Sequence, residues 1–460
     1  MGVCRGQLRG NLGAFAGRPL AFAPVLLAAV LWGCRAGQVA QPGAAGVDPA
    51  VSASPSRAVI RYAYWAVNRH ETQLLQELKA AFEKRNPGAQ VQLLGVSERY
   101  YEKLQTMIAS GEAPDAFSVN YGRLADFVRA GTVRDLSKFV AADPALEKGC
   151  LSAAWASTKA LAKAIRRPGL WGLPKDWPPA GLVLYNRDLL AAAGVRPPTT
   201  ENPWTWRDFE KACRAVAAAR LPDVYPTALN LYPYTLFTWI AQAGGSVVGE
   251  DGSIRAAEPA VAEAIQFVLG LWRSGLAPRP SPGHDNSFEL FTAGRVALLV
   301  ASFYNVQSCR ELRGIDWGVG PPLQHRRWAC SGLPTYVAIA AASSNPRQAW
   351  AWARFLTTEG ALSYAAECIT VPAWRPALSP EVFLATPPLS RARDAVMAAL
   401  RLTQPPPLHP DLPYELIADE MRTAVEQAIA RGLDGPATAR RLAERLVQAQ
   451  REKLSRSPRR

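Results

Sequence analysis

The fold is decided by residues 59–94, which read VIRYAYWAVNRHETQLLQELKAAFEKRNPGAQVQLL. Val59 to Trp65 alternates in the manner of a strand, and a second strand follows at Val91 to Leu94. Between them, Asn86-Pro87-Gly88 ends a helix whose apolar residues recur at helical spacing: Leu74, Leu75, Leu78 and Phe82. A strand, a helix and a strand in this order form a βαβ unit, which predicts a parallel pair of strands with a right-handed crossover.

The same alternation continues along the chain and predicts an α/β fold. Further strands are expected at 116–119, 182–185, 296–301 and 336–342. Helices are expected at 100–109, 124–130, 188–193, 206–219, 258–274 and 346–357, and beyond Leu416 the chain is predicted to be mostly helical. Asp251-Gly252 is typical of a hairpin turn between two short strands. About 400 residues remain after the N-terminal segments, which is enough for two domains.

Residues 1–33 have the pattern of a secretory signal peptide. Three arginines precede an apolar run from Leu20 to Leu31, which is about half the length that spans a bilayer core. Cys34 directly follows a small residue, so the segment resembles a bacterial lipoprotein signal, in which the cysteine is lipidated and becomes the first mature residue. The alternative is a plain signal peptide or membrane anchor with an incidental cysteine. Either one predicts a protein that works outside the cytoplasm.

The segments that flank the folded part are polar or basic. Residues 34–56 are rich in small and polar side chains and predict a flexible tether, which would space a lipid-anchored domain from the membrane. Residues 451–460 predict a frayed basic tail. The formal charge is +14, and loss of the three signal-peptide arginines lowers it to +11. Because arginine is spread along the chain and no basic helix carries interleaved aromatic residues, we expect no nucleic-acid partner.

Five cysteines remain once Cys4 and Cys34 are assigned to the signal and the lipid: Cys150, Cys213, Cys309, Cys330 and Cys368. An odd number without any CxxC pair argues against a zinc site, and the sequence predicts no metal and no cofactor. An extracellular location permits a disulfide, and Cys309 and Cys330 are the closest pair in sequence. Whether these two are bonded stays open, with isolated buried thiols as the default expectation.

Several local motifs follow one another over nearly the whole mature chain. They are LKAAFEKRNPG at 78–88, YEKL at 101–104, ASGEAPD at 109–115, GLP at 172–174, LYNRDL at 184–189, WTW at 204–206, GG at 244–245, FTAGRVA at 291–297, and NPRQAW at 345–350 before FL at 355–356. In this order, and behind a lipoprotein signal, they resemble the family 1 extracellular solute-binding proteins of ABC importers, the group that contains maltose-binding protein. Leu298 and Ser331 depart from the methionine and glycine usual in relatives, and neither change affects the resemblance.

The resemblance implies two lobes with a ligand cleft between them, each lobe a mostly parallel sheet flanked by helices. It implies three hinge crossings, which we expect near Pro179–Leu182, Gly332–Thr335 and Val371–Trp374. The N-terminal lobe is then expected to comprise 57–181 plus 335–372, and the C-terminal lobe 182–334 plus 373–450.

The resemblance also implies a function. The chain is expected to be the extracytoplasmic substrate-binding component of a bacterial ABC importer, a lipid-anchored monomer that closes on its ligand and delivers it to a membrane permease. The aromatic content favours a carbohydrate, with an oligosaccharide first among the choices. Members of the same family also bind polyols and glycerol phosphate esters. A uronide is a further alternative, because Arg99, Arg375 and the positive net charge could bind its carboxylate.

The expected ligand residues follow from the chemistry of sugars. Their C–H faces stack on aromatic rings and their hydroxyls need hydrogen-bond partners, so the site should combine both kinds of side chain on loops at strand ends. The candidates are Trp65, Asn68, Glu98, Arg99, Tyr100, Asn120, Tyr121, Asp176, Trp177, Tyr232, Tyr234, Trp239, Phe303, Tyr304, Asn305, Gly332, Trp374 and Arg375.

Two other classes of function remain as alternatives. An extracellular glycoside hydrolase would need paired carboxylates such as Asp176 and Glu98. The chain contains no GxSxG, HExxH or P-loop motif, and its four histidines show no ligand spacing, so we expect no enzyme. A cell-surface adhesion module would not need the hinged two-lobe pattern.

Overall fold

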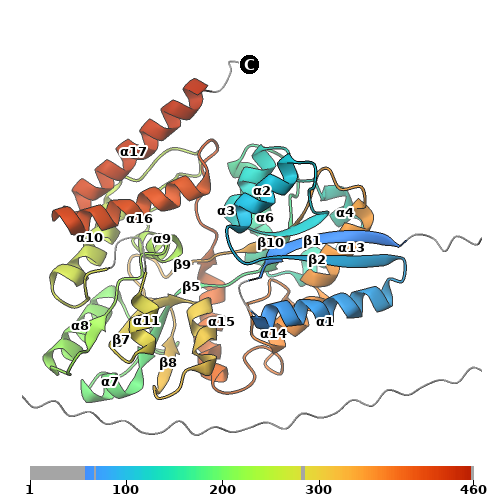
Figure 1. The fold of residues 1–460 in the computed structure, drawn as a ribbon. Helices are drawn as coiled ribbons and strands as arrows, with labels where there is room; N and C mark the ends of the chain where they lie inside the picture. Colours follow the sequence, from blue (N-terminus) through green and yellow to red (C-terminus); the bar gives the residue numbers. More distant parts are fainter. Residues whose placement is uncertain (1–56, 67–68, 281–284, 457–460) are drawn as a thin grey trace, which may run out of the picture. The chain divides into compact units, whose positions relative to one another are not determined.

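In the computed structural model, residues 57–66, 69–280 and 285–456 are described, and they belong to one compact unit that spans Pro55–Arg460. The unit contains two separate sheets, each at the core of one lobe (Figure 1). The βαβ unit predicted from residues 59–94 is confirmed, with β1 at Ala58–Trp65, α1 at Arg69–Arg85 and β2 at Ala89–Val96. Strands β1 and β2 pair in parallel.

The first sheet has five strands in the order β2-β1-β3-β10-β4. Its further strands are β3 Ala116–Asn120, β4 Leu173–Asp176 and β10 Thr335–Ile339. The second sheet has four strands in the order β6-β7-β5-β8, which are β5 Ala180–Asn186, β6 Tyr225–Thr227, β7 Val296–Ser302 and β8 Trp317–Gly320. A short parallel pair joins β9 Cys330–Ser331 to β11 Thr403–Gln404.

Helices cover both sheets. Those before β5 are α2 Tyr100–Ala109, α3 Tyr121–Arg129, α4 Ser137–Ala141, α5 Ala145–Gly149 and α6 Ser152–Ala164. Those between β5 and β9 are α7 Arg187–Ala192, α8 Trp206–Ala218, α9 Pro233–Gln242, α10 Pro259–Arg273, α11 Ser287–Thr292, α12 Phe303–Ser308 and the 3-10 turn η1 Cys309–Glu311. Those after β10 are α13 Pro346–Thr357, α14 Glu359–Ala366, η2 Arg375–Leu378, η3 Leu389–Ala392, α15 Arg393–Leu402, α16 Tyr414–Arg431 and α17 Gly435–Arg456.

Both sheets are mostly parallel, as expected, and each contains a single strand that runs against the others. In the first sheet β10 runs antiparallel to both β3 and β4, and in the second sheet β5 runs antiparallel to both β7 and β8. These two strands are the ones that the chain enters directly after crossing from the other lobe. Because the chain arrives from the opposite side, each of them runs against its neighbours.

Three hinge segments meet where the lobes join. The chain crosses between β4 and β5 at residues 177–179 and between β9 and β10 at residues 332–334. The N–H of Gly332 donates to the carbonyl oxygen of Gln404 at 3.0 Å. A Cβ on Gly332 would lie 2.9 Å from the carbonyl oxygen of Pro178, so the absence of a side chain permits this close approach of backbones.

The third crossing lies later than the segment Val371–Trp374. The N–H of Ala373 donates to the carbonyl oxygen of Lys175 at 2.8 Å, so this segment continues along the edge strand of the first sheet. The chain then passes from η2, which packs on α14, to η3, which packs on β8 of the second sheet. Residues 379–388 therefore make the passage between the lobes.

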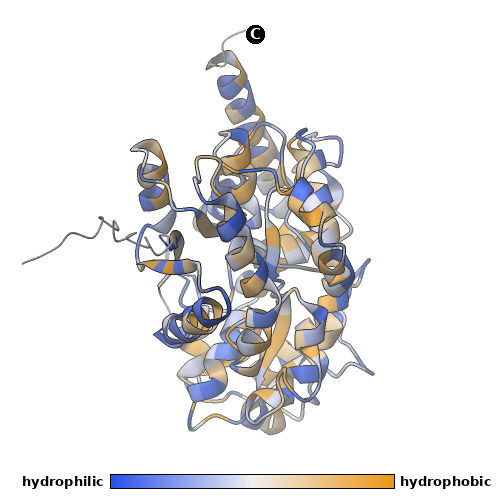
Figure 2. Ribbon diagram, turned by 90° about the vertical axis from the view of Figure 1, so that its right-hand side faces the viewer, coloured by the Kyte–Doolittle hydropathy of each residue, from blue (hydrophilic) through white to orange (hydrophobic). Residues whose placement is uncertain are grey.

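Hydrophobic residues concentrate in the strands and on the inward faces of the helices, while hydrophilic residues lie on outer helix faces (Figure 2). The five cysteines of the described region are all buried and unpaired, which answers the open question about Cys309 and Cys330. Helix α17 packs along α10 and extends through Arg456, so most of the tail expected to be frayed is helical. No helix in the described ranges is both long and apolar enough to cross a membrane.

Two helical glycines offer a matched test of the packing between α3 and α16. A Cβ on Gly122 would lie 2.2 Å from Cγ of the Tyr414 ring, whereas a Cβ on Gly270 in α10 meets nothing within 4 Å. We expect Gly122→Ala to lower the free energy of unfolding by about 1–3 kcal/mol, because a rigid ring must move. Gly270→Ala should raise it by about 0.5–1 kcal/mol through helix propensity. Denaturant unfolding of both variants checks this, and equal effects would contradict the packing of Tyr414.

Candidate functional site

A buried lysine lies at the junction of the lobes. Lys175 and Asp176 end β4, and both side chains are buried. Lys175 Nζ lies 3.0 Å from Asp176 Oδ2 and 3.6 Å from Oε1 of Glu71, which is in the first turn of α1. It also lies 3.9 Å from the centroid of the Tyr364 ring. Two carboxylates and an aromatic face therefore offset the cost of burying this cation.

The electrostatics of this pair follow from burial and proximity. Burial raises the pKa of Asp176 to about 6, although the positive charge of Lys175 by itself would lower that pKa. Burial by itself would lower the pKa of Lys175, but Asp176, Tyr364 and Glu71 more than offset this and hold that pKa well above its usual value. Lys175 is therefore a permanent cation at neutral pH, and Asp176 is its close counterion.

The second lobe places two tyrosines beside this pair. Tyr304 follows β7 in the first turn of α12, and burial raises its pKa, with Asp176 as the next cause. Tyr234, near the start of α9, lies beside Ser302 and within electrostatic range of Tyr304. We call the following residues the interlobe cluster: Glu71, Lys175, Asp176, Tyr234, Tyr304, Tyr364 and Thr370.

One polar atom of the interlobe cluster is buried without a hydrogen-bond partner. It is Oδ1 of Asp176, which has no partner within the part of the chain that the structure describes, whereas the hydroxyl of Thr370 interacts with that of Tyr304. A buried polar atom without a partner costs about 1–3 kcal/mol, so most proteins avoid it. A buried acceptor of this kind can instead bind a hydroxyl group of a ligand.

Aromatic residues extend the interlobe cluster on both sides. Tyr232, which is half exposed, stacks on Tyr234 with ring centroids 5.4 Å apart and planes 6° apart. On the first lobe, the Trp65 ring lies 4.7 Å from that of Tyr100 and 5.7 Å from that of Tyr101. This side therefore offers further ring faces at the end of β1.

Helix α16 bridges the two lobes next to these rings. The Arg123 guanidinium lies 4.9 Å from the centroid of the Tyr101 ring, and its Nε lies 3.0 Å from Oε1 of Glu415. Tyr414 packs against Gly122 and lies 6.2 Å, ring to ring, from Phe237 of α9. The start of α16 thus contacts α3 of the first lobe and α9 of the second.

Among the residues predicted from the sequence, Asp176, Tyr234 and Tyr304 belong to the interlobe cluster, Tyr232 stacks on it, and Trp65 lies in the aromatic group at the end of β1. Asn68 lies outside the described residues.

Three other predicted residues make local structural bonds. The hydroxyl of Tyr100 donates to the carbonyl oxygen of Ser118 at 2.7 Å. Asn120 Oδ1 accepts from the N–H of Arg123 at 3.0 Å and caps α3. Asn305 Oδ1 accepts from the N–H of Ser302 at 3.0 Å in the capping box of α12. In each case the hydrogen bond of the side chain stabilises a strand end or a helix start.

Three predicted aromatic residues lie in the hydrophobic core. Trp177 is fully buried in the crossing between β4 and β5, and its backbone N–H donates to the carbonyl oxygen of Val371 at 2.7 Å. Trp239 packs against Trp206 with ring centroids 5.3 Å apart, and Phe303 packs against Phe383 at 6.0 Å. None of the three presents an exposed ring face in this conformation.

The remaining predicted residues lie away from the interlobe cluster. Glu98 and Arg99 are exposed before α2, and Arg99 forms an ion pair with Glu102. Trp374 covers Gly149, and Arg375 donates to the carbonyl oxygens of Lys148 and Cys150, so both pack on the first lobe. Gly332 is a hinge residue. Tyr121 packs against the Tyr336 ring and lines a pocket beside α6 and α9.

Several residues of the site were not predicted from the sequence. Glu71 and Lys175 could have been predicted from the sequence, since each lies within a few residues of a predicted ligand residue and therefore carried a sequence signal. Tyr364, Thr370, Tyr414 and Glu415 had none, because only long-range packing brings their helices and loops to the junction. The described ranges contain no group of three or more His, Cys, Asp and Glu side chains placed to hold a metal ion.

Two α/β lobes joined by three crossings, with polar and aromatic side chains gathered at the junction, define a hinged two-lobe binding protein. The sequence profile of the family described as bacterial extracellular solute-binding protein matches residues 67–362. This match covers more than half of the chain, and the chain belongs to that family.

Curated relatives and solved structures are similar to the chain. An uncharacterized lipoprotein in the oleD 5' region of Streptomyces antibioticus is 26% identical over 295 residues, covering 61% of this chain and 62% of the relative. The chain therefore matches less than two thirds of that relative's length. An ABC substrate-binding protein from Listeria monocytogenes in complex with cycloalternan has a TM-score of 0.74 at 23% identity, covering 86% of this chain and 99% of the other.

Two more structures agree on the fold. The GacH receptor of Streptomyces glaucescens, solved unliganded and with acarbose, has a TM-score of 0.70 at 18% identity, covering 87% of this chain and 99% of the other. The sugar-binding protein MalE from Xanthomonas citri has a TM-score of 0.70 at 22% identity, covering 87% and 100%. The predicted two-lobed fold is thereby confirmed, and cycloalternan and acarbose are ligands of those other proteins.

The raised pKa of Asp176 predicts a pH dependence of stability. Its folded pKa of about 6 exceeds the unfolded value of about 3.9, so the folded state binds the proton more tightly. This contribution is full below about pH 4 and is lost as the pH rises through 6, by at most about 3 kcal/mol. We expect the free energy of unfolding of the wild type to fall relative to that of Asp176→Asn between pH 4 and 7. Asp316→Asn, which alters an exposed aspartate paired with Arg391, is the control. Parallel profiles for wild type and Asp176→Asn would contradict the burial of this carboxyl.

Proposed function

We propose that this protein is the extracytoplasmic substrate-binding component of an ABC importer and that it captures a carbohydrate, with an oligosaccharide as the favoured ligand. Membership of the bacterial extracellular solute-binding family supports the role in transport. Cycloalternan and acarbose are the ligands named for two similar structures, which supports the carbohydrate. No catalytic step is proposed, because the family and these neighbours are binding proteins.

The interlobe cluster is the observation that carries the proposal. Sugars need aromatic faces for their C–H surfaces and fixed partners for their hydroxyls. Tyr304 and Tyr234 supply rings from the second lobe, while Asp176 Oδ1 supplies a buried acceptor without a partner in the described chain. The stacked pair of Tyr232 and Tyr234 and the group around Trp65 extend the ring faces outward, which suits a ligand of more than one sugar unit.

The charges of the interlobe cluster favour a neutral ligand over a uronide or a glycerol phosphate ester. Lys175 is already paired with Asp176 and Glu71, so its positive charge is offset before a ligand arrives. Arg123 is likewise paired with Glu415. An anionic ligand would have to displace one of these carboxylates, at the cost of leaving a buried charge without its partner.

Closure of the lobes supplies the mechanism. Asp176 belongs to the first lobe and Tyr304 to the second, so a ligand can contact both only when the lobes approach. Such a ligand favours the closed form by its difference in affinity between the two forms. The closed form would then dock on the permease, and the protein would act as a monomer.

The binding test uses the purified full chain and a panel of neutral oligosaccharides, polyols, uronides and glycerol phosphates. We expect a neutral oligosaccharide to bind without being consumed, as measured by thermal shift and calorimetry. Tyr304→Ala should raise its Kd at least about tenfold, because a buried ring contact is lost. Tyr304→Phe keeps the ring and should stay within about threefold of the wild type.

Three outcomes of this panel would contradict the proposal. Turnover of a sugar would point to a hydrolase. Preference for a uronide or a phosphate ester would overturn the argument from the paired Lys175. Equal losses in Tyr304→Ala and Tyr304→Phe would show that the ring face does not carry the binding.

We infer a lipid anchor at Cys34, preceded by a signal peptide at residues 1–33 and followed by a tether through residue 56. These residues lie outside the described structure, and the inference depends on their sequence pattern. A match to a relative described as a lipoprotein supports it. The anchor would hold the binding domain near its permease at the bacterial cell membrane.

Fractionation of a bacterial host that expresses the full chain tests the anchor. The wild type should sediment with membranes, and Cys34→Ala should remove the lipid attachment site and abolish metabolic labelling with a palmitate analogue. Cys4→Ala is the matched control and should keep the label. A label that persists in Cys34→Ala would overturn the assignment.

A further inference from the structure

A cavity lies at the junction of the lobes, apart from the interlobe cluster. It has a volume of about 470 Å³, and none of the residues of the interlobe cluster lines it. This volume lies within the range of about 300–1,000 Å³ that is usual for small-molecule sites. The cavity is therefore large enough for a ligand of its own.

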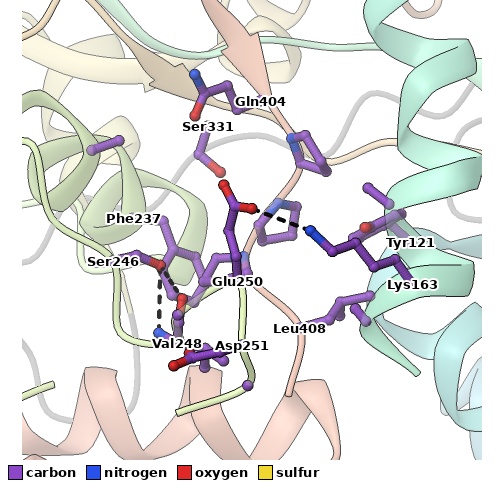
Figure 3. A pocket seen from close by; sticks show the side chains of 18 of the residues that line it. Tyr121, Lys163, Phe237, Ser246, Val248, Glu250, Asp251, Ser331, Gln404 and Leu408 are labelled. Atoms are coloured by element: carbon purple, nitrogen blue, oxygen red, sulfur yellow. Dashed lines mark hydrogen bonds and ion pairs between the residues drawn. The ribbon is translucent and has the colours of Figure 1, made fainter. Parts of the chain in front are cut away.

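The walls of this cavity, which we call the hinge pocket, come from both lobes. Helix α6 and Tyr121 form the wall of the first lobe, while α9 and the turn at 245–252 form the wall of the second. Figure 3 shows Lys163 and Glu250 reaching toward each other across the pocket, with Nζ and Oε2 3.2 Å apart. Ser331 of β9, residues 404–408 and Pro410 complete the lining.

Most of the lining is apolar. Phe237 and Ile240 of α9, Leu408 and the prolines 405–407 contribute hydrocarbon surface. Such a lining favours a ligand with an apolar body, because burial releases about 25 cal/mol per Å² of apolar surface.

One hydroxyl of the lining, that of Ser331, is buried without a hydrogen-bond partner in the described chain. Ser331 is only 4% exposed, and its backbone N–H donates to Oγ1 of Thr238 at 3.0 Å, which fixes its position in β9. Its own Oγ has no hydrogen-bond partner within the described ranges. Figure 3 shows the Ser331 side chain directed toward Glu250 and the interior of the pocket. A hydroxyl on a ligand would satisfy this group.

The charges of the lining balance one another. Lys163 and Arg166 carry two positive charges, and Glu250 and Asp251 carry two negative ones. A pocket with this balance has no net attraction for either an anion or a cation. An uncharged ligand therefore fits it best.

We propose that the hinge pocket is a second binding site, for an uncharged molecule with an apolar ring body and one hydroxyl that bonds to Ser331 Oγ. Because both lobes supply its walls, an occupant favours one arrangement of the lobes over others. If the proposed sugar binding holds, on which this step rests, the occupant changes the affinity for the sugar and the sugar changes its affinity by the same factor.

Calorimetry of the purified full chain with 2-naphthol, a neutral two-ring compound with one hydroxyl, tests the site. We expect one equivalent to bind with a Kd of about 0.1–1 mM, the range open to so small a ligand. Ala160 lines the pocket on the exposed side of α6, and Ala160→Trp should fill it and weaken binding at least about tenfold. Ala156→Trp changes an equally exposed alanine one turn earlier on α6, outside the lining, and should leave the Kd unchanged.

The outcomes separate the parts of the proposal. No binding of 2-naphthol, or equal Kd values for the two tryptophan variants, would overturn the site. Ser331→Ala should weaken binding about three- to tenfold, and an unchanged Kd would overturn the assigned hydrogen bond. These measurements need no sugar, so a failure of the hinge-pocket site can be distinguished from a failure of the proposed sugar binding.

The coupling is tested last, with a sugar that binds the wild type. Its Kd should change at least about threefold at saturating 2-naphthol, and this change should disappear in Ala160→Trp. An equal Kd with and without 2-naphthol would overturn the coupling. A change that persists in Ala160→Trp would show that 2-naphthol acts at the sugar site instead.

Discussion

The pairing of β10 between β3 and β4 is the constraint on which the rest of the structure depends. The chain builds most of the second lobe before it returns to insert this strand, antiparallel to both neighbours, into the first sheet. This return brings Gly332 against Pro178 and Gln404, so that the hinge segments lie side by side. The ends of β4 and β7 then face the same junction, and Lys175, Asp176 and Tyr304 meet there.

Burial of ionised groups at a hinge has a functional consequence. Lys175 is held by two carboxylates and a tyrosine face, and this arrangement is costly unless all of its partners stay in place. The partners Glu71, Asp176 and Tyr364 all belong to the first lobe, so the lobes can separate without breaking this set. The second lobe contributes Tyr304, which lies within electrostatic range of Asp176, and Tyr234, which lies within range of Tyr304.

The junction holds two chemically different sets of side chains. The interlobe cluster combines rings with buried polar atoms and charges, which suits a hydroxylated ligand. The hinge pocket is apolar, has balanced charges and contains one unpaired hydroxyl at Ser331. Because α9 supplies Tyr234 to one set and Phe237 and Ile240 to the other, a rotation of this helix with its lobe changes both. This shared helix is the physical basis for coupling between them.

The sequence alone determined the α/β class, the first βαβ unit, most helix limits and the family resemblance, because these depend on local periodicity, caps and short motifs. It also proposed Asp176, Tyr234 and Tyr304 as ligand residues, and the structure places all three in the interlobe cluster. Only the tertiary structure separated these residues from Trp177, Trp239 and Phe303, which occupy similar positions in the sequence but point into the core. It also decided the mixed strand directions, the third crossing and the parts played by Tyr364, Thr370 and Tyr414. Such features arise from contacts between residues far apart in the chain, which no local pattern records.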